Sequence, residues 1–360
     1  MISTVTKTLP ALAAQASIGA LLLWLIWYTW RFIITPKMYP DRPKELPYLI
    51  PCKMCASACV VLHFGHIRSL FTSSSSSFTE GKLQFGGDIW ICTLLGKPVY
   101  VVASAKAVQT VYKMPKVLSR DEFIKSVFEE SGVDQDIQNR LFDLSSTGEG
   151  SWATRTVQYW KSQLNPGEKL EAIQKELFTL VEDALSWERR SKHMIGENEK
   201  GTKSVLLYAF TGDVLIHEQV KVFFDVSIYE IRPGLVRIFQ RYEEEVWRLG
   251  MGIPNFLASG FFSLHHELKQ AMVNYVKQPP EKHSRQSWII HKIDDEMRKM
   301  DVSSYQRGCV LFTFFHVMNT NTYKLAFWTL AYNLFHDSSL LDDIRAESTP
   351  AFKKRNLYQL

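Results

Sequence analysis

One apolar segment, residues 315–330 (FHVMNTNTYKLAFWTL), carries hydrogen-bonding side chains in the middle of what otherwise reads as a single buried helix. The polar residues nearest its centre are His316, Asn319, Thr320, Asn321 and Thr322. A Ser or Thr hydroxyl that bonds to a carbonyl one turn earlier can bend a helix and open its wall. The same residues also occur in apolar helices where the backbone simply satisfies them. Residue types alone therefore leave both a reactive site and a purely structural segment open.

Two other clusters contain residue types that bind metals. Three thiols follow one another as Cys52-x-x-Cys55-x-x-x-Cys59, and thiolates at such spacing can share an ion. We favour a loop or an inserted stretch there instead. The residues His265-His266-Glu267 are adjacent, and neighbouring side chains on a helix diverge by about 100°. We therefore interpret them as a solvated face and predict no metal site.

The composition indicates a folded protein that does not bind nucleic acid. Of the 360 residues 46% are apolar and 13% aromatic, which is enough for a sizeable core. The net charge of +5 is mild and evenly spread, so nucleic acid is not an expected partner. The five cysteines are an odd number and three of them are crowded together, which favours a reducing compartment.

The N-terminal segment predicts a membrane anchor. Residues 8–30 contain no charge, and 23 helical residues span the roughly 30 Å hydrocarbon layer. A cleaved signal peptide is the alternative, but the run is long and ends in Trp24, Trp27, Tyr28 and Trp30, as an aromatic belt would. Several basic residues follow the segment and only Lys7 precedes it, so the positive-inside rule places the rest of the chain in the cytosol.

The remainder divides into four regions. Residues 31–51 contain repeated prolines and predict an extended strap, and residues 52–87 form an uncertain loop or insertion with a serine run. Residues 88–118 predict a small β-rich piece, with a hairpin turning at residues 96–98 and a helix over 105–113 capped by Ser104. Residues 119–360 predict a helical body, with a helix break at Pro166-Gly167, a surface loop over 194–203, and helices over 234–249, 264–276, 288–299 and 305–335.

Several motifs, in this order, resemble the cytochrome P-450 family of haem-thiolate monooxygenases. They are the proline strap, the segment LLGKPVYVVASAKAVQTVYK, then LSRDEF, QLNPGEKL and the stretch NTNTYKLAFWTL. Within the family, these motifs look like those of the sterol 7-alpha-hydroxylase and prostacyclin synthase branch, including its fungal relatives. The resemblance implies a mainly α (α+β) fold with a P-450-like helical body, a single-pass endoplasmic reticulum anchor, haem as cofactor, an NADPH-dependent reductase as partner and a lipophilic substrate.

The resemblance also implies roles for particular residues. Thr320, Asn321 and Thr322 stand in the central-helix motif A-G-x-[DE]-T-T, where the family passes protons to bound dioxygen; here Thr320 replaces the acid, and Val317 and Met318 replace small residues. Two residues are candidates to pair with haem propionates, and seven are candidates to contact substrate. These are, respectively, Arg155 and Lys161, and Phe123, Val127, Leu249, Ile253, Phe315, His316 and Asn319.

The family's thiolate signature, F-x-x-G-x-R-x-C-x-G, does not occur in these 360 residues. Cys309 has Arg307 two positions before it but lacks the Phe and Gly positions, and we expect it to be a small buried residue. Residues 245–248 match the family's E-x-x-R only by letter, as chance allows. We therefore expect an incomplete fold, truncated after the central helix and without activity. The alternatives are a non-catalytic membrane protein and an incomplete gene product.

Overall fold

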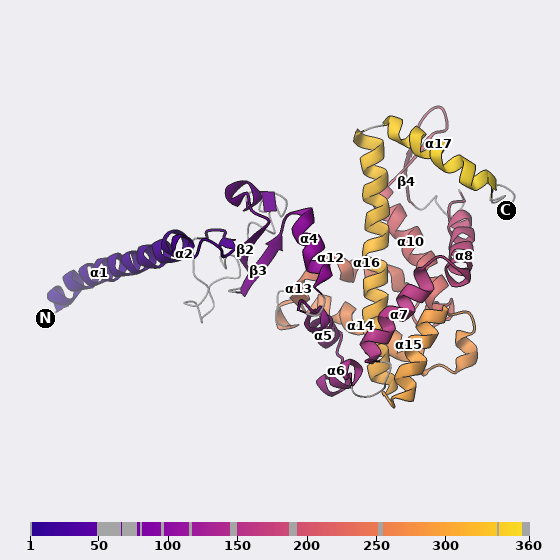
Figure 1. Cartoon of the computed structure of the whole chain (residues 1–360), viewed down its shortest axis with the longest axis horizontal. Coiled ribbons are helices and arrows are strands. Elements are labelled where there is room, and N and C mark those ends of the chain that lie inside the picture. The colour runs from indigo at the N-terminus through magenta and orange to yellow at the C-terminus, as the bar shows by residue number, and fades with distance from the viewer. Residues whose placement is uncertain are drawn as a thin grey trace. The chain divides into compact units, whose positions relative to one another are not determined.

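A computed structural model of the chain describes residues 2–48, 66, 78–79, 81–94, 97–114, 117–144, 150–186, 193–250, 255–336 and 338–354. The chain divides into two compact units, residues 1–120 and residues 121–360. It is mainly helical, with few strands, and begins with one long apolar helix (Figure 1). The predicted helical class is confirmed at this level.

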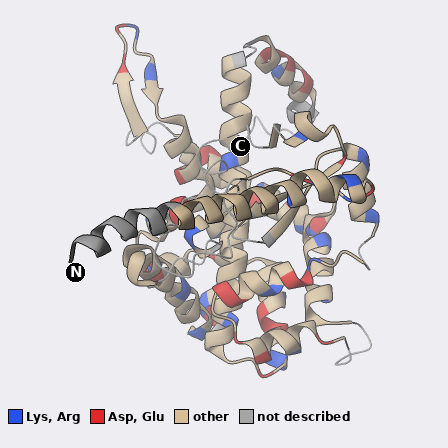
Figure 2. Ribbon diagram, turned by 90° about the vertical axis from the view of Figure 1, so that its left-hand side faces the viewer, with Lys and Arg blue, Asp and Glu red and all other residues tan. Residues whose placement is uncertain are grey.

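The N-terminal helix of the first unit is long and apolar enough to cross a membrane. Helix α1 (Ile2–Thr29) continues through a π-helical turn, η1 (Trp30–Ile34), into α2 (Thr35–Met38). The candidate membrane span covers Gln15–Met38 and is not buried against other parts of the protein. Residues 15–29, the part of α1 whose side chains the structure describes, contain no charged residue (Figure 2).

The extended strap begins later than predicted. Residues 31–38 are helical, whereas an extended chain was expected from residue 31. Pro36 lies in the first turn of α2, where a missing backbone N–H breaks no hydrogen bond of that helix. The prolines therefore shape the chain only after Met38.

A small sheet completes the first unit. Strand β1 (Lys44–Glu45) pairs in parallel with β2 (Ile89–Leu94), and β2 pairs antiparallel with β3 (Lys97–Val102). The predicted hairpin is confirmed, and its core consists of Leu46, Trp90 and Cys92. Helix α4 (Ala105–Lys113) follows, and Ser104 caps it by accepting a hydrogen bond from the Ala107 amide at 3.1 Å, also as predicted.

Most of the uncertain region 52–87 lies outside the described residues, including Cys52, Cys55 and Cys59. Three parts of it are described, namely residue 66, residues 78–79 and residues 81–87. Residues 81–85 are helical, so this part is not the predicted loop. His66 is buried, and its Nδ1 atom accepts a hydrogen bond from the Thr93 amide in β2 at 3.2 Å.

The second unit is built from helices, with the bounds that follow. They are α5 (Asp121–Glu130), α6 (Gln135–Phe142), α7 (Trp152–Leu164), α8 (Glu168–Ala184), α10 (Leu207–Phe224), α11 (Ser227–Ile231), α12 (Leu235–Glu245), α13 (Trp247–Gly250), α14 (Ser259–Lys277), α15 (Trp288–Lys299), α16 (Ser304–His336) and α17 (Ser338–Lys354), with 3-10 turns η4 (Asn255–Leu257) and η5 (Pro280–His283). Basic and acidic positions are interspersed over these helices (Figure 2).

The predicted helix boundaries agree closely at some places and fail at others. The break at Pro166-Gly167 is confirmed, since α7 ends at Leu164 and α8 begins at Glu168. Helix α15 has the predicted limits, and α16 is one residue longer at each end. The predicted surface loop over 194–203 is wrong, because β4 (Met194–Glu197) pairs with β5 (Lys203–Val205).

Helix α16 is the axis of the second unit. It packs mainly against α14 and α10 and lies at the centre of the large core cluster (Figure 1). At the crossing with α14, a Cβ atom added to Gly308 would lie 2.5 Å from the Cα atom of Val273. The two backbones therefore approach so closely that only glycine fits at this position.

Candidate functional site

The three residues predicted to act on dioxygen do not converge on one point. Thr320, Asn321 and Thr322 occupy successive positions of α16, which is a continuous α-helix there, so their side chains leave the helix about 100° apart. Thr320 is half-buried, whereas Asn321 and Thr322 are exposed. The structure thus places them around the helix instead of on one wall of a site.

Three polar side chains near the middle of α16 bond back to their own helix. Asn319 donates from Nδ2 to the Phe315 carbonyl at 2.7 Å, Thr320 donates to the His316 carbonyl at 2.9 Å, and Thr322 donates to the Met318 carbonyl at 3.0 Å. Each bond reaches one turn back, as in the structural interpretation of this segment. The Oδ1 atom of Asn319 is buried and has no hydrogen-bond partner among the described residues.

The predicted substrate contacts on α16 lie in the hydrophobic core. Phe315 is fully buried, with its ring centroid 5.7 Å from Phe224 and 5.2 Å from Phe239. The His316 ring lies 5.5 Å from Tyr242, and burial lowers its pKa despite the nearby Glu243 carboxylate. His316 is therefore neutral and, like Phe315, packs α16 against its neighbours.

The other predicted substrate contacts have different environments. Phe123 in α5 is 71% exposed, while Val127 in the same helix is half-buried. Leu249 in α13 packs on the rim of the core. Ile253 lies outside the described residues. The structure therefore does not gather these residues with Phe315 into one site.

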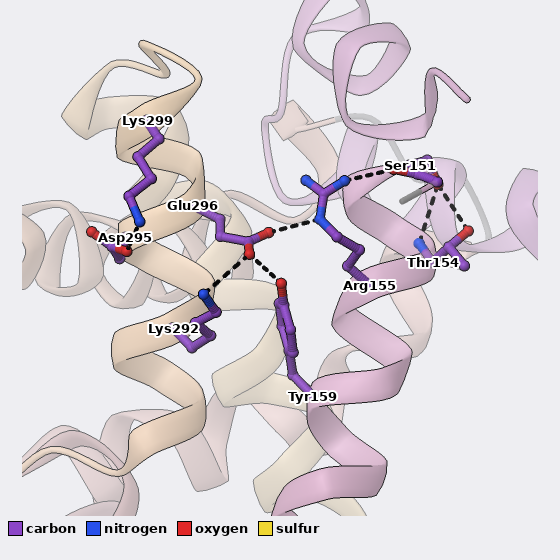
Figure 3. Close-up of polar contacts among 9 residues, drawn as sticks. Ser151, Thr154, Arg155, Tyr159, Lys292, Asp295, Glu296 and Lys299 are labelled. Atoms are coloured by element: carbon purple, nitrogen blue, oxygen red, sulfur yellow. Dashed lines mark hydrogen bonds and ion pairs between the residues drawn. The ribbon is translucent and has the colours of Figure 1, made fainter. Parts of the chain in front are cut away.

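Arg155 lies in a polar cluster that joins α7 to α15 (Figure 3). Its Nε atom donates to Glu296 Oε2 at 3.1 Å, and its Nη1 atom donates to the Gly150 carbonyl at 2.5 Å. The Tyr159 hydroxyl donates to the other Glu296 oxygen, and Lys292 Nζ lies 3.4 Å from that same oxygen. A single half-buried carboxylate thus binds two residues of α7 and one of α15.

The proton affinities in this cluster follow from burial and from the hydrogen bonds. Burial and the neighbouring Glu296 carboxylate raise the pKa of Tyr159 to about 12. Burial by itself raises the pKa of Glu296, but hydrogen bonds from Tyr159 and Arg155 outweigh it and leave that pKa below its usual value. Glu296 is therefore ionised at neutral pH, and Tyr159 keeps its proton.

Arg155 and Lys161 do not fit the predicted role of holding the two haem propionates. The Arg155 guanidinium is already bound by a half-buried carboxylate and a backbone carbonyl. Lys161 is exposed and lies six residues farther along α7, on a different side of that helix. The two cations therefore do not approach a common ligand, and we derive no haem chemistry from them.

The prediction that His265 lies on a solvated face is wrong. It is 7% exposed, with its ring 5.8 Å from Tyr242 and 5.3 Å from Phe312. Burial lowers its pKa to about 4, and the positive charge of Lys269 adds to this effect. Its neighbour Glu267 forms an ion pair with Arg232, so the adjacent residues serve different contacts.

Sequence reasoning missed a cavity of about 510 Å³ beside α14 and α15. Its lining includes Tyr275, His283 and Asp294. Burial lowers the pKa of His283, and its Nδ1 atom has no partner among the described residues. Asp294 is bound by Arg307 at 3.0 Å and by Arg298 at 2.8 Å, so its charge is compensated. These residues are dispersed in the sequence and share no motif.

Sequence reasoning also missed that Tyr323 and Lys324, which follow the polar residues of α16, share a buried acidic partner. Tyr323 donates to the buried carboxylate of Glu243 in α12 at 2.9 Å, and Lys324 forms an ion pair with the same group. Tyr208 of α10 lies 3.1 Å from the Tyr323 hydroxyl. A cation that follows several polar residues in an apolar helix was the available signal for a buried acid nearby.

Comparison with known proteins identifies no family for this chain. No protein-family model matches the sequence, and a search of the curated proteins finds no match. Among the residues that the structure describes, no group of three His, Cys, Asp or Glu side chains is placed to hold a metal ion.

Proposed function

We propose that this chain is a single-pass endoplasmic reticulum membrane protein related to the cytochrome P-450 monooxygenases, with its body in the cytosol. The observation that carries the proposal is the order of the family-like segments: an apolar helix, a small sheet with its capped helix, and a helical body around one long central helix. That family inserts one oxygen atom from O₂ into lipophilic substrates, using haem and electrons from an NADPH-dependent reductase.

The proposal is that the chain is related to the cytochrome P-450 family, and it assigns no oxygen chemistry to these 360 residues. In the family, the thiolate that serves as the fifth iron ligand comes from the signature motif, and neither Cys92 nor Cys309 lies in such a motif. Both thiols are buried, and burial raises the pKa of each, which disfavours the thiolate form. Both described cysteines are therefore protonated thiols at neutral pH in this chain.

Sequencing of the full transcript through the codon for Leu360 tests this relationship. We expect the reading frame, directly or after an unspliced intron, to continue into the E-x-x-R and Cys signature motifs. A genuine stop codon after Leu360 in every transcript would leave only the second proposal. Restoring the longer reading frame should produce the carbon monoxide difference spectrum of a haem thiolate.

A second proposal is a membrane-bound protein without catalytic activity. It is favoured because three of the expected site residues already form hydrogen bonds within the protein. Arg155 is bound to Glu296, Thr320 to the His316 carbonyl and Thr322 to the Met318 carbonyl. The test is a carbon monoxide difference spectrum of the reduced 360-residue chain, expressed with ample haem. The absence of a Soret band supports this proposal, and a band typical of thiolate ligation refutes it.

A further inference from the structure

A second cavity, of about 490 Å³, lies within the first unit at the charged end of the membrane-type helix. Its lining comes from the end of that helix, the turn that follows it and the small sheet. Its charged and aromatic residues are Arg31, Tyr39, Arg42, Lys44, Glu45 and Tyr100. Three of these are cations and one is a carboxylate, so the charge of the lining is net positive.

The single carboxylate of the cavity is already neutralised. Arg31 binds Glu45 with two parallel hydrogen bonds, from Nε at 2.8 Å and from Nη2 at 2.9 Å. The Thr93 hydroxyl donates to the same carboxylate. A bidentate pair of this kind satisfies both charges, so Glu45 does not compensate the remaining cations.

Two cations of the cavity remain without a counter-ion among the described residues. The Arg42 guanidinium lies 4.4 Å from the centre of the Tyr39 ring, a contact that orients it without neutralising its charge. Lys44 is exposed, and none of its described neighbours forms an ion pair with it. Tyr39 and Tyr100 are exposed residues of the same lining, and each has a hydroxyl group that can donate a hydrogen bond.

The position of the cavity along the chain corresponds to the headgroup layer of a bilayer. The uncharged run ends at Trp30, and the lining begins with Arg31 and Thr35 in the next turns of the same helix. About 12 Å of helix separates Trp30 from Met38. Aromatic side chains at the end of a span mark the membrane interface, and basic pockets beside it bind anionic headgroups.

We propose that this cavity binds the phosphate group of an anionic phospholipid, with Arg42 and Lys44 as its charged ligands. The inference rests on the membrane anchoring proposed above, but not on the relationship to monooxygenases. The lipid source is favoured over free phosphate because the cavity also has apolar walls, Pro36, Pro43 and Ile91, that suit the glycerol and upper acyl region.

The test is a lipid titration of the full chain in a neutral detergent, followed by native mass spectrometry. The probes are dioctanoyl phosphatidic acid, dioctanoyl phosphatidylcholine and inorganic phosphate. We expect phosphatidic acid to bind and phosphatidylcholine not to bind. The double variant R42Q/K44Q should lower the affinity for phosphatidic acid on the order of tenfold, because each basic residue near an anionic lipid contributes several-fold.

The control is the double variant K106Q/K113Q, which removes two exposed lysines of α4 that do not line the cavity. Unchanged affinity in this control supports a defined site, and an equal loss in both double variants overturns it. The charge-preserving variant R42K/K44R should keep most of the affinity. If it loses as much as R42Q/K44Q, charge is not the basis of binding and the proposal is wrong.

Two further measurements distinguish lipid from free phosphate as the ligand, and failure of the anchor from failure of the site. If inorganic phosphate displaces phosphatidic acid over the concentration range in which the lipid binds, the ligand is free phosphate and the lipid proposal is overturned. Anchoring is measured independently by flotation of the full chain with phosphatidylcholine vesicles after an alkaline carbonate wash. Failure to float refutes the anchor and with it the headgroup site, whereas flotation without phosphatidic acid binding refutes the site alone.

Discussion

At the scale of residues, the half-buried side chain of Glu296 determines the contacts of several others. Its carboxylate binds Arg155 and Tyr159, which lie 141 and 137 positions earlier in the chain (Figure 3). The side chains of Glu296 and Arg155 are 13% and 14% exposed, so their charges are largely removed from water. Breaking such a pair leaves an uncompensated charge, which is the costly outcome for a buried ion pair. Arg155 thus acts as a link between two helices.

Replacing Glu296 by Gln should destabilise the full chain by about 2 kcal/mol, since hydrogen bonds to charged groups contribute about 1.5–3 kcal/mol. R155M should cost a similar amount, and the double variant should cost less than the two together because they share one interaction. Urea unfolding in neutral detergent measures this. K299Q on the same helix is the control, since the Asp295–Lys299 pair is exposed, and it should leave the midpoint unchanged. Strict additivity of R155M and E296Q would contradict the link.

The lowered pKa of Glu296 gives a pH dependence of known sign. A carboxyl whose folded pKa lies below its unfolded value stabilises the fold above the unfolded pKa of about 4.3. This contribution disappears as the pH falls through the folded pKa. The wild-type chain should therefore lose more stability than E296Q below about pH 4.3, as measured by urea midpoints across that range.

His265 should give a pH dependence of the same sign as Glu296, but over a higher pH range. Its folded pKa of about 4 lies below the unfolded value, so the unfolded chain binds the additional proton. Stability is complete above the unfolded pKa of about 6.5 and falls as the pH decreases toward 4. Between pH 7.5 and pH 5 the loss should be about 2 kcal/mol. In H265F this loss should disappear, and H266F, which changes the adjacent residue, should keep it.

At the scale of elements, the close crossing of α14 and α16 sets the geometry of the helical unit. The crossing depends on Gly308, because any side chain there would meet the backbone of Val273. Overpacking of this kind forces helices apart and disturbs the contacts along both of them. The core residues on either side of the crossing, Cys309 and Met272, are fully buried and have little room to adjust.

The variant G308A should therefore lower the stability of the full chain by about 1–3 kcal/mol, even though Ala is the better helix former. G260A is the matched control, because an added Cβ at Gly260 in α14 meets nothing within 4 Å. G260A should leave the thermal midpoint unchanged or slightly higher. If both variants behave alike, helix propensity and not the crossing dominates at Gly308.

At the scale of the whole molecule, the long apolar helix is the feature with the clearest consequence. No charge interrupts residues 8–30, and several side chains of its described part, Leu21, Leu22, Leu23 and Ile26 among them, are exposed in the isolated chain. A soluble protein would bury such side chains against its core. A bilayer is the environment that matches a helix of this length.

Placing a charge in the middle of this helix should prevent membrane insertion. L22R introduces a side chain that costs about 3 kcal/mol at the centre of a span, whereas S3R places the same charge outside residues 8–30. We expect L22R to reduce strongly the fraction of chain that resists carbonate extraction from microsomes, and S3R to leave it near the wild-type value. Equal extraction of all three chains would show that the helix does not span.

Local patterns in the sequence were sufficient to predict the type and the boundaries of many secondary-structure elements. Charge-free length identifies the apolar helix, alternation and turn residues identify the hairpin of β2 and β3, and Ser104 and Pro166-Gly167 mark helix boundaries. These features depend on residues a few positions apart, because helix and strand periodicities and capping are local properties. Asn319, Thr320, Asn321 and Thr322 are unusual in being polar within an apolar helix. Their spacing, however, could not show which of them would face the core and which the solvent.

The sequence by itself determined a mainly helical chain with a candidate membrane helix and a polar segment in its central helix. Only the tertiary structure decided that Arg155 is bound by Glu296, that His265 is buried, and that a basic cavity lies at the end of the apolar helix. The physical reason is distance along the chain. These contacts join residues that no local pattern relates, and burial, which sets their charges and partners, exists only after the elements have packed.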